Sequence, residues 1–236
     1  MPSASSIELA VFLSILLAAL RMRPRRFYFV RHGETILNAV DVRQGAEGKL
    51  SESGRAQAEK VGRYLRRFPI HCMISSTYER ARETSEIINA YLKVPIIYSP
   101  LLVERRNPKE IIGKNRGDLE VVRIVDQIEL AYHADDYRFS DEENFMDLKA
   151  RARKCIDLLA RQGARETVVV THHVFLKIFL AYILYRERLH AADFTKLAFF
   201  NFSENATVTI CEFHPWKFFS KTRGWKVVSF NEQPPE

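Results

Sequence analysis

The chain has 236 residues, of which 47% are hydrophobic and 28% charged, and it carries a formal net charge of +7 at pH 7. This length and composition are enough to bury the core of one domain, and the positive charge favours anionic partners: phosphorylated small molecules, nucleic acid or a membrane surface. The three cysteines, Cys72, Cys155 and Cys211, have no close pair, which excludes a disulfide framework and a Cys-x-x-Cys motif and fits a reducing cytosol.

Residues 7–20 are the most apolar stretch of the chain. They are shorter than the run of about 20 residues that crosses a bilayer, and Glu8 interrupts them. A secretory signal places its positive charge before the apolar region, whereas the arginines come after it here. Two interpretations stay open: a membrane-associating helix held by those arginines, or residues 1–21 as a non-native extension upstream of a true start at Met22. We favour the second, with one domain over residues 22–236 and a cytoplasmic location.

The densest basic cluster follows directly, at Arg21, Arg23, Arg25 and Arg26. It lacks interleaved aromatic residues on which bases could stack, and no nucleic-acid-binding motif follows it. We therefore expect no nucleic-acid partner, and we interpret the remaining positive charge as solvated surface.

The first predicted strand is the apolar run Phe27–Val30, whose aromatic and β-branched residues suit a buried strand. Arg31, His32 and Gly33 follow it without a gap. Packing does not explain a cation and an imidazole at the end of a buried strand, so these residues lie either in a solvated turn or in a site.

Helices and strands alternate after this point. The apolar periodicity predicts helices over 51–68, 79–92, 118–131, 145–161 and 174–184. Short apolar runs predict strands over 72–75, 94–98 and 167–171. The C-terminal segments alternate like antiparallel strands at the sheet edge, over 197–202, 206–213 and 225–230. The acidic stretch 135–143 is interpreted as a solvated loop.

This alternation predicts an α/β fold, a three-layer α/β/α sandwich with a mainly parallel central sheet. Ligands of such sheets bind outside the carboxyl ends of the strands. Arg31 and His32 follow one such end, Ser75–Arg80 follow a second, and His172 follows a third. We therefore expect three separate segments to bring basic groups to one rim, with His32 and His172 facing each other across a small cavity.

An ordered set of motifs resembles the histidine phosphatase superfamily, which includes phosphoglycerate mutases and many small phosphatases. The resemblance spans about residues 26–210. Its main motifs are RHGET (31–35), SSTYERARET (75–84) and VVVTHH (168–173), supported by QG (44–45), LSESGRAQA (50–58) and ENFMDLKARA (143–152). A lone RHG would be a weak signal, whereas the ordered set in strand-to-helix context is specific.

The resemblance implies a role for each of six residues and implies neither a metal nor a cofactor. His32 is the nucleophile that takes the phosphoryl group, Arg31 and Arg80 hold the phosphate, His172 is the second pocket histidine, Glu104 is the general acid, and the Asn38 amide donates to the phosphate. Arg82 lies in the same motif as Arg80, but the spacing from Ser75 and Ser76 favours Arg80.

These residue types suit phosphoryl transfer on physical grounds. With an unperturbed pKa of about 6.5, a histidine is largely neutral at pH 7 and offers one ring lone pair. We expect a backbone carbonyl to hold the other nitrogen of His32 as a donor, with Gly33 letting the turn approach the ring. Two guanidinium groups neutralise the phosphate oxygens and position the phosphorus, and His172, if protonated, adds a third positive donor.

Two of these assignments compete with simpler ones. Successive residues of an extended segment point to opposite sides, so one of His172 and His173 is expected to reach the pocket, and we favour His172. His173 replaces a glycine that is common in the family. Glu104 is either the general acid or a surface carboxylate in a solvated loop.

The function predicted from the sequence is a metal-independent phosphatase that hydrolyses a small phosphorylated metabolite through a phosphohistidine. A phosphoglycerate mutase is the alternative, which the resemblance disfavours because Leu37 stands where those mutases have tryptophan. A non-catalytic module that binds phospho-ligands is a third hypothesis. The sequence predicts no oligomeric state.

Overall fold

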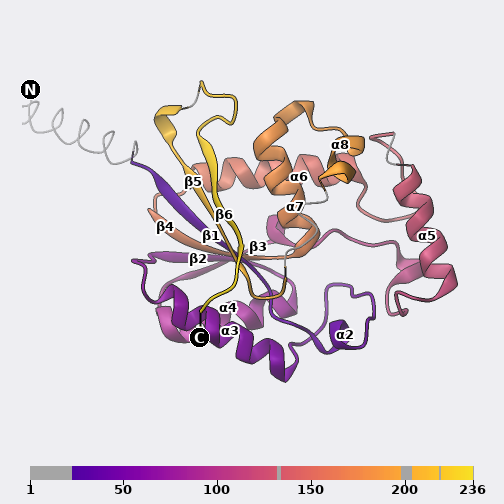
Figure 1. The fold of residues 1–236 in the computed structure, drawn as a ribbon, viewed down its shortest axis with the longest axis horizontal. Coiled ribbons are helices and arrows are strands. Elements are labelled where there is room, and N and C mark those ends of the chain that lie inside the picture. Colours follow the sequence, from indigo (N-terminus) through magenta and orange to yellow (C-terminus); the bar gives the residue numbers. More distant parts are fainter. Residues whose placement is uncertain (1–22, 132–133, 198–203, 218, 236) are drawn as a thin grey trace, which may run out of the picture.

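One six-stranded sheet forms the centre of the structure, a computed structural model that describes residues 23–131, 134–197, 204–217 and 219–235. The strands are β1 Arg25–Arg31, β2 Cys72–Ser76, β3 Ile96–Ser99, β4 Glu166–Thr171, β5 Val208–Phe213 and β6 Trp225–Glu232. Their order is β3-β2-β4-β1-β5-β6 (Figure 1). The first four are parallel, and β5 runs antiparallel to β1 and β6. This confirms the mainly parallel sheet and two of the predicted C-terminal strands.

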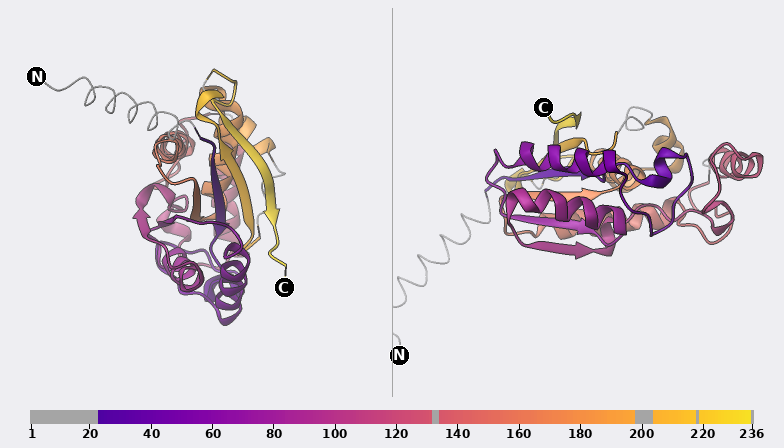
Figure 2. Two further views of the ribbon diagram at one scale, coloured as in Figure 1. Left: turned by 90° about the vertical axis from the view of Figure 1, so that its left-hand side faces the viewer. Right: turned by 90° about the horizontal axis from the view of Figure 1, so that it is seen from below.

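Helices cover both faces of the sheet, as the sequence predicts. The α-helices are α2 Ile36–Ala39, α3 Glu52–Leu65, α4 Glu79–Leu92, α5 Leu119–Leu130, α6 Phe145–Ala160, α7 His173–Tyr185 and α8 Ala191–Lys196. Short 3-10 turns are η1 Pro100–Leu102, η2 Lys109–Ile111, η3 Arg186–Arg188 and η5 Pro215–Lys217. Helices α3 and α4 lie on one face, and α6 and α7 lie on the other (Figures 1 and 2).

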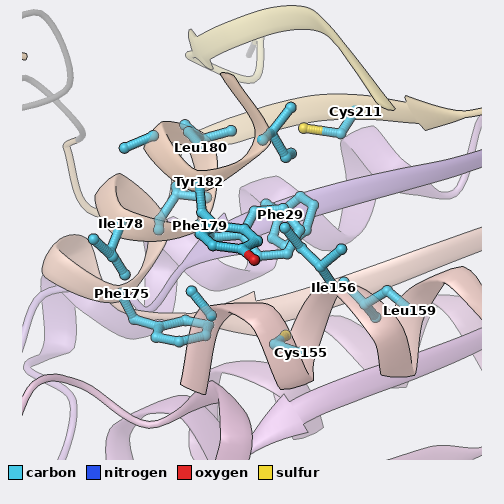
Figure 3. Packing of buried hydrophobic residues seen from close by; sticks show 14 of the residues in the cluster. Phe29, Cys155, Ile156, Leu159, Phe175, Ile178, Phe179, Leu180, Tyr182 and Cys211 are labelled. Atoms are coloured by element: carbon cyan, nitrogen blue, oxygen red, sulfur yellow. The ribbon is translucent and has the colours of Figure 1, made fainter. Parts of the chain in front are cut away.

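The alternation of side chains along the strands explains these layers. In β1, Phe27 and Phe29 pack with the helices α6 and α7, whereas Tyr28 and Val30 pack with α3 and α4. Figure 3 shows Phe29 against Phe179 of α7, with ring centroids 4.6 Å apart. Each such fully buried side chain contributes about 1.5–3 kcal/mol to folding. The two apolar faces thus fix the three-layer sandwich.

The backbone conformation and capping of a few residues explain where helices and strands differ from the prediction. The strand predicted from residue 94 begins at Ile96, because Lys93 ends α4 in the left-handed conformation, with φ of 54°. Helix α2 is too short for a periodic pattern and depends on its cap, in which Thr35 and Asn38 exchange side-chain and backbone hydrogen bonds. The strand predicted over 197–202 falls almost wholly on 198–203, outside the described residues.

The strand register places the carboxyl ends of the parallel strands at the same edge of the sheet. Arg31 of β1 pairs with Thr171 of β4, and Ser76 of β2 pairs with Ser99 of β3. Because β2 also pairs in parallel with β4, residues that follow these strands emerge side by side. This edge is where the predicted site residues meet.

Helix α5 lies to one side of the sandwich in Figures 1 and 2. It packs with η2 in a small cluster of its own, formed by Ile111, Val121, Ile124 and Ile128. Within the described ranges, no helix combines the length and apolarity that crossing a bilayer requires. The proposed membrane contact through residues 7–20 lies outside those ranges.

Candidate functional site

A cavity of about 330 Å³ opens at the carboxyl ends of the parallel strands. Five of the six residues singled out from the sequence line it: Arg31, His32, Asn38, Arg80 and Glu104. The sixth, His172, does not line the cavity, but its ring centroid lies 5.0 Å from that of His32. Two of the three expected segments thus supply their named basic groups to the cavity. From the third segment the cavity is lined by His173 and not by His172, so the choice of His172 as the histidine that reaches the cavity is not met in this structure.

His32 is held with one ring nitrogen as a donor and the other as an acceptor. Its Nδ1 lies 2.8 Å from the carbonyl oxygen of Gly33, and its Nε2 lies 3.3 Å from Nε of Arg80. Because a guanidinium nitrogen can only donate, this network assigns the proton to Nδ1 and the lone pair to Nε2. The predicted backbone carbonyl is thus present, and the lone pair is on the nitrogen beside Arg80.

Burial holds the pKa of His32 well below 6.5, and the positive charges of Arg80 and Arg31 lower it further. The side chain is 4% exposed, so water cannot solvate a charged ring. His32 is therefore neutral at pH 7 in the phosphate-free protein, which is the state that a nucleophile requires.

Several elements fix the backbone around His32. Its N–H donates to the carbonyl of Thr171 at 3.0 Å, and its own carbonyl accepts from Nδ2 of Asn205 at 2.9 Å. The N–H of Gly33 donates to Oγ1 of Thr84 at 3.1 Å. These bonds join the loop after β1 to the strand β4, to the segment before β5 and to the helix α4.

Gly33 is also needed for the packing of the loop against a helix. A Cβ at this position would lie 2.4 Å from the carbonyl oxygen of Gly54, in the first turns of α3. The absence of a side chain at Gly33 therefore allows the backbone of α3 to approach the loop.

Arg80 and Arg82 differ sharply in their surroundings. Arg80 is 3% exposed, contacts His32, and donates from Nη1 to the carbonyl of Gly45 at 2.9 Å. Arg82 is exposed and lies over the ring of Tyr98, 4.3 Å from its centroid. Two residues correspond to about 200° around a helix, so the two guanidinium groups leave α4 on opposite sides. Only Arg80 lines the cavity.

Arg31 and Asn38 complete the floor of the cavity. Burial lowers the pKa of Arg31 to about 10, with Glu104 opposing and Arg116 and Arg80 reinforcing that shift, so the group stays charged at pH 7. Oδ1 of Asn38 accepts from the N–H of Thr35 at 3.4 Å. This bond directs the acceptor end of the amide to the backbone and leaves its Nδ2 donors for a ligand.

His172 lies closer to His32 than the sequence suggests. The two ring centroids are 5.0 Å apart, so the imidazoles pack against each other, and the cavity borders His32 and the neighbouring His173. Nε2 of His172 lies 2.8 Å from Oγ of Ser76. Burial, followed by the charge of Arg80, holds the pKa of His172 well below 6.5, so it is neutral in the phosphate-free protein. Its contact with phosphate stays a prediction.

Glu104 lines the cavity and also caps a helix. Its carboxylate accepts from the N–H groups of Phe175 at 3.0 Å and Val174 at 3.2 Å, at the start of α7. The segment before it is held by Arg151, whose Nη1 donates to the carbonyl of Val103 at 2.7 Å. Arg151 is in turn paired with Glu143 at 2.6 Å. Glu104 therefore has a fixed place in the cavity wall and is no loose surface carboxylate.

Comparison with known proteins supplies the family. The family model described as "Histidine phosphatase superfamily (branch 1)" matches residues 27–226. The chain belongs to the histidine phosphatase superfamily. It is 29% identical over 168 residues to "Probable phosphatase C1620.13" of Schizosaccharomyces pombe, covering 67% of this chain and 56% of that protein.

Two further proteins match at greater coverage. "Broad-specificity phosphatase YOR283W" of Saccharomyces cerevisiae is 28% identical over 202 residues, which are 80% of this chain and 79% of that protein. The solved structure of mycobacterial glucosyl-3-phosphoglycerate phosphatase Rv2419c with VO3 superposes with a TM-score of 0.72 at 23% identity, covering 88% of this chain and 99% of that one. The shared fold agrees with the predicted sandwich.

Sequence reasoning on the superfamily motifs missed other residues that line the cavity. Three are arginines: Arg43, Arg105 and Arg116. Arg105 directly follows Glu104, a position that could have drawn attention to it. Arg43 and Arg116 come from irregular loops, where no periodic pattern or motif marks a residue as cavity-facing. Ser76 and Asn205 were also missed, because their roles consist of hydrogen bonds to His172 and to the backbone of His32.

A second hollow, of about 390 Å³, is slightly larger than the His32 cavity. Arg153, Tyr182 and Trp225 line part of it, and no histidine does. Of these two hollows, the one that contains His32 combines an imidazole with guanidinium groups and a carboxylate, so we take it as the candidate site. In the described ranges, no three histidine, cysteine or acidic side chains cluster as metal ligands.

Proposed function

We propose that the protein is a metal-independent phosphatase that hydrolyses a small phosphomonoester through a phosphohistidine on His32. One observation carries the proposal: the Nε2 lone pair of a buried, neutral imidazole lies 3.3 Å from the guanidinium of Arg80, at the wall of a cavity that Arg31 also lines. A nucleophile and two cations thus share the place that a phosphoryl group would take.

In the first step, the phosphate dianion enters between Arg31 and Arg80. Nε of Arg80 then donates to a phosphoryl oxygen and releases Nε2 of His32. As the N–P bond forms, the bond from phosphorus to the substrate oxygen breaks, and that oxygen takes a proton from Glu104 and leaves as the alcohol. The guanidinium groups stabilise the charge on the non-bridging oxygens throughout.

In the second step, water replaces the alcohol. Glu104, now a carboxylate, takes a proton from the water as its oxygen attacks phosphorus, and the N–P bond breaks with its electrons returning to Nε2. Inorganic phosphate leaves, and His32 is again neutral. The Gly33 carbonyl holds the Nδ1 proton in place during both steps, which keeps Nε2 as the reacting atom.

The unpaired ring nitrogen Nδ1 of His172 supports the proposal. Among the described residues, its buried Nδ1 has no hydrogen-bond partner, while its Nε2 bonds to Ser76. A buried polar atom without a partner costs free energy, which a phosphoryl oxygen as partner would recover. A bound dianion would also raise the pKa of His172 and favour its charged, doubly donating form.

The names of relatives agree with a phosphatase. Both curated proteins reported above are named as phosphatases, and so is the mycobacterial protein. The cavity volume of about 330 Å³ is at the lower end of the range of about 300–1,000 Å³ that is typical of small-molecule sites. A small phosphorylated metabolite is therefore the substrate class we propose.

The deciding experiment is hydrolysis of an aryl phosphate by purified protein, with and without a chelator. We expect turnover that the chelator does not change. Loss of turnover on chelation would contradict the metal-independent mechanism. Tight binding of phosphate without turnover would support a non-catalytic module instead.

A second assay separates the phosphatase from the mutase. The protein is incubated with monophosphoglycerate in the presence and absence of the bisphosphate. Release of inorganic phosphate is expected, and isomerisation without phosphate release would identify a mutase.

A further inference from the structure

The turn between β5 and β6, residues 214–224, exposes aromatic side chains at the end of β1 opposite the candidate site. Phe213 of β5 pairs with Arg25, the first residue of β1, whereas the site follows the last residue of that strand. Trp216 is 45% exposed and Phe219 is 97% exposed. In Figure 1 the turn (yellow) projects from the end of the sheet at which β1 begins. Large apolar side chains gathered on one exposed turn are typical of an interaction site.

Positive side chains surround these aromatic residues. Residues 213–231 contain three lysines and one arginine and no acidic residue. All four are exposed: Lys217, Lys221, Arg223 and Lys226. The residue opposite Lys226 on β5 is Glu212, which already pairs with Arg26 at 2.6 Å. The charge of the turn is therefore positive, which favours an anionic partner.

The hollow of about 390 Å³ that Trp225 lines borders the turn and is also basic. Its lining contains four cations and two acids, namely Arg153, Lys154, Arg186, Arg223, Asp157 and Glu187. Arg186, at the end of α7, donates from Nη2 to the carbonyl of Thr222 in the turn. The positive surface thus extends from the turn onto α6 and the end of α7.

Hydrogen bonds within the turn satisfy much of its backbone. The N–H of Ser220 donates to the carbonyl of Lys217, and the N–H of Arg223 donates to the carbonyl of Ser220, both at 2.9 Å. The N–H of His214 donates to the carbonyl of Gly224 at 2.8 Å. Backbone groups bonded in this way need no water, which lowers the cost of placing the turn in the interface of a bilayer.

The most apolar stretch of the sequence joins the fold at the same end. Residues 7–20 are separated from β1 by residues 21–24 alone, two of which are arginines. Because Arg25 pairs with Phe213, the chain enters β1 beside the base of the turn. The turn therefore supports the first of the two interpretations of residues 7–20, a membrane-associating segment held by the arginines that follow it.

We propose that the β5–β6 turn binds the surface of an anionic lipid membrane, with Trp216 and Phe219 entering the interface and Lys217 and Lys221 contacting the headgroups. Tryptophan is enriched at membrane interfaces, and each lysine near an anionic leaflet strengthens binding about fivefold. Single-stranded nucleic acid would also suit aromatic and basic side chains, but it offers no partner for the neighbouring apolar stretch. The inference does not depend on the proposed function, because it concerns binding and not turnover.

The two tryptophans of the chain allow the contact to be measured directly. Trp216 is 45% exposed, and Trp225 is 3% exposed. The full chain is mixed with vesicles of phosphatidylcholine and phosphatidylserine whose acyl chains carry bromine, which quenches tryptophan emission on contact. We expect quenching of the wild-type chain and its loss in W216F, where the buried tryptophan alone remains. A chain that sediments with the vesicles but is not quenched would place the membrane contact elsewhere and overturn the proposal, as would a chain that does not bind them.

Lysine variants test the contribution of charge in a vesicle sedimentation assay. K217Q/K221Q is expected to bind phosphatidylserine-containing vesicles at least about tenfold more weakly than the wild type, since each lysine contributes about fivefold. K49Q/K109Q removes the same charge from two exposed lysines of other loops and should bind like the wild type. Equal affinities of the two variants would assign the binding to net charge alone and contradict a contact through the turn.

The lipid-free chain tests the other possible occupants of the turn. Acrylamide, a neutral aqueous quencher, should reach Trp216 in the wild-type chain. If residues 7–20 or a second copy of the chain cover the turn, Trp216 is shielded from acrylamide and from brominated lipid, and dilution restores its exposure only for the second copy. Quenching by a single-stranded oligothymidylate, without quenching by brominated lipid, would assign nucleic acid. Each of these results overturns the proposal.

Discussion

The floor and the rim of the cavity are made in different ways. The floor, with His32, Arg31 and Arg80, follows the ends of strands, and His32 and Arg80 are buried in it. Hydrogen bonds tie its backbone to three neighbouring elements. The rim, with Arg43 and Arg116, is built from two loops that pair with each other, and Arg116 is exposed. This difference indicates that the sheet fixes the chemistry, while the loops select what is brought to it.

The floor can be broken most completely at its nucleophile. His32→Ala is expected to lower kcat by about 10⁴-fold or more, because the variant lacks the proposed nucleophile of the covalent step. A quench of the wild-type reaction at alkaline pH should trap a phosphohistidine, which His32→Ala should lack. His71→Ala, at an exposed histidine, is the control. Label on His32→Ala would contradict the assignment.

The next largest effect is expected at Arg80. Arg80→Gln removes a charge that contacts His32 and should lower kcat/KM by about 10²–10³-fold, as expected for loss of one donor to the transition state. Arg82→Gln is a matched control on the same helix and should stay within about twofold of the wild type. Similar losses in both variants would show that the helix, and not the floor contact, matters.

Glu104 lines the cavity and also caps α7. Substrates with different leaving groups distinguish a role as general acid from a role as helix cap. Glu104→Gln cannot donate a proton, so kcat for an alkyl phosphate should fall about 10²-fold, while an aryl phosphate, whose leaving group needs less protonation, should lose less than about tenfold. The amide oxygen can still cap α7. Equal losses for both substrates would leave Glu104 with the capping role alone.

The smallest expected effect is a loss of folding stability at acid pH, caused by the two buried histidines His32 and His172. The folded-state pKa values of His32 and His172 are held below 6.5 by burial, so the unfolded chain binds more protons below that pH. The free energy of unfolding should therefore fall as pH decreases below about 6.5, by up to about 1.4 kcal/mol per pH unit for each histidine.

Urea unfolding at pH 7.5 and pH 5.5 measures this effect. A variant with both His32→Asn and His172→Asn should show a smaller loss between these pH values than the wild type. His71→Asn should behave like the wild type. An identical loss in all three would assign the acid sensitivity to other groups.

The floor was largely predictable from the sequence because motifs follow strands. The apolar run Phe27–Val30 predicted β1, and the residues after it could only lie at its carboxyl end. The helices α4 and α7 were predicted within one residue at each end. The predicted apolar side of α4 contains its buried Ala81, Thr84 and Ile88, whereas α7 is an apolar segment that is buried at every residue over 175–183. The choice of Arg80 over Arg82, made from the spacing to Ser75 and Ser76, agrees with the residues that line the cavity.

Other features depend on packing that no local pattern records. The contact of Gly33 with Gly54 joins a loop to a helix 21 positions away, and its cause is visible only when α3 is placed. The close packing of His172 on His32 depends on the level of β4 beside β1. The rim arginines depend on pairing between irregular segments, which sequence periodicity cannot show.

The direction of β1 has a practical consequence. The strand begins at Arg25 and delivers Arg31 to the cavity, a span of roughly 20 Å at about 3.3 Å per residue. A dye joined to residue 24, directly ahead of the strand, would therefore lie at the opposite end of β1 from the cavity.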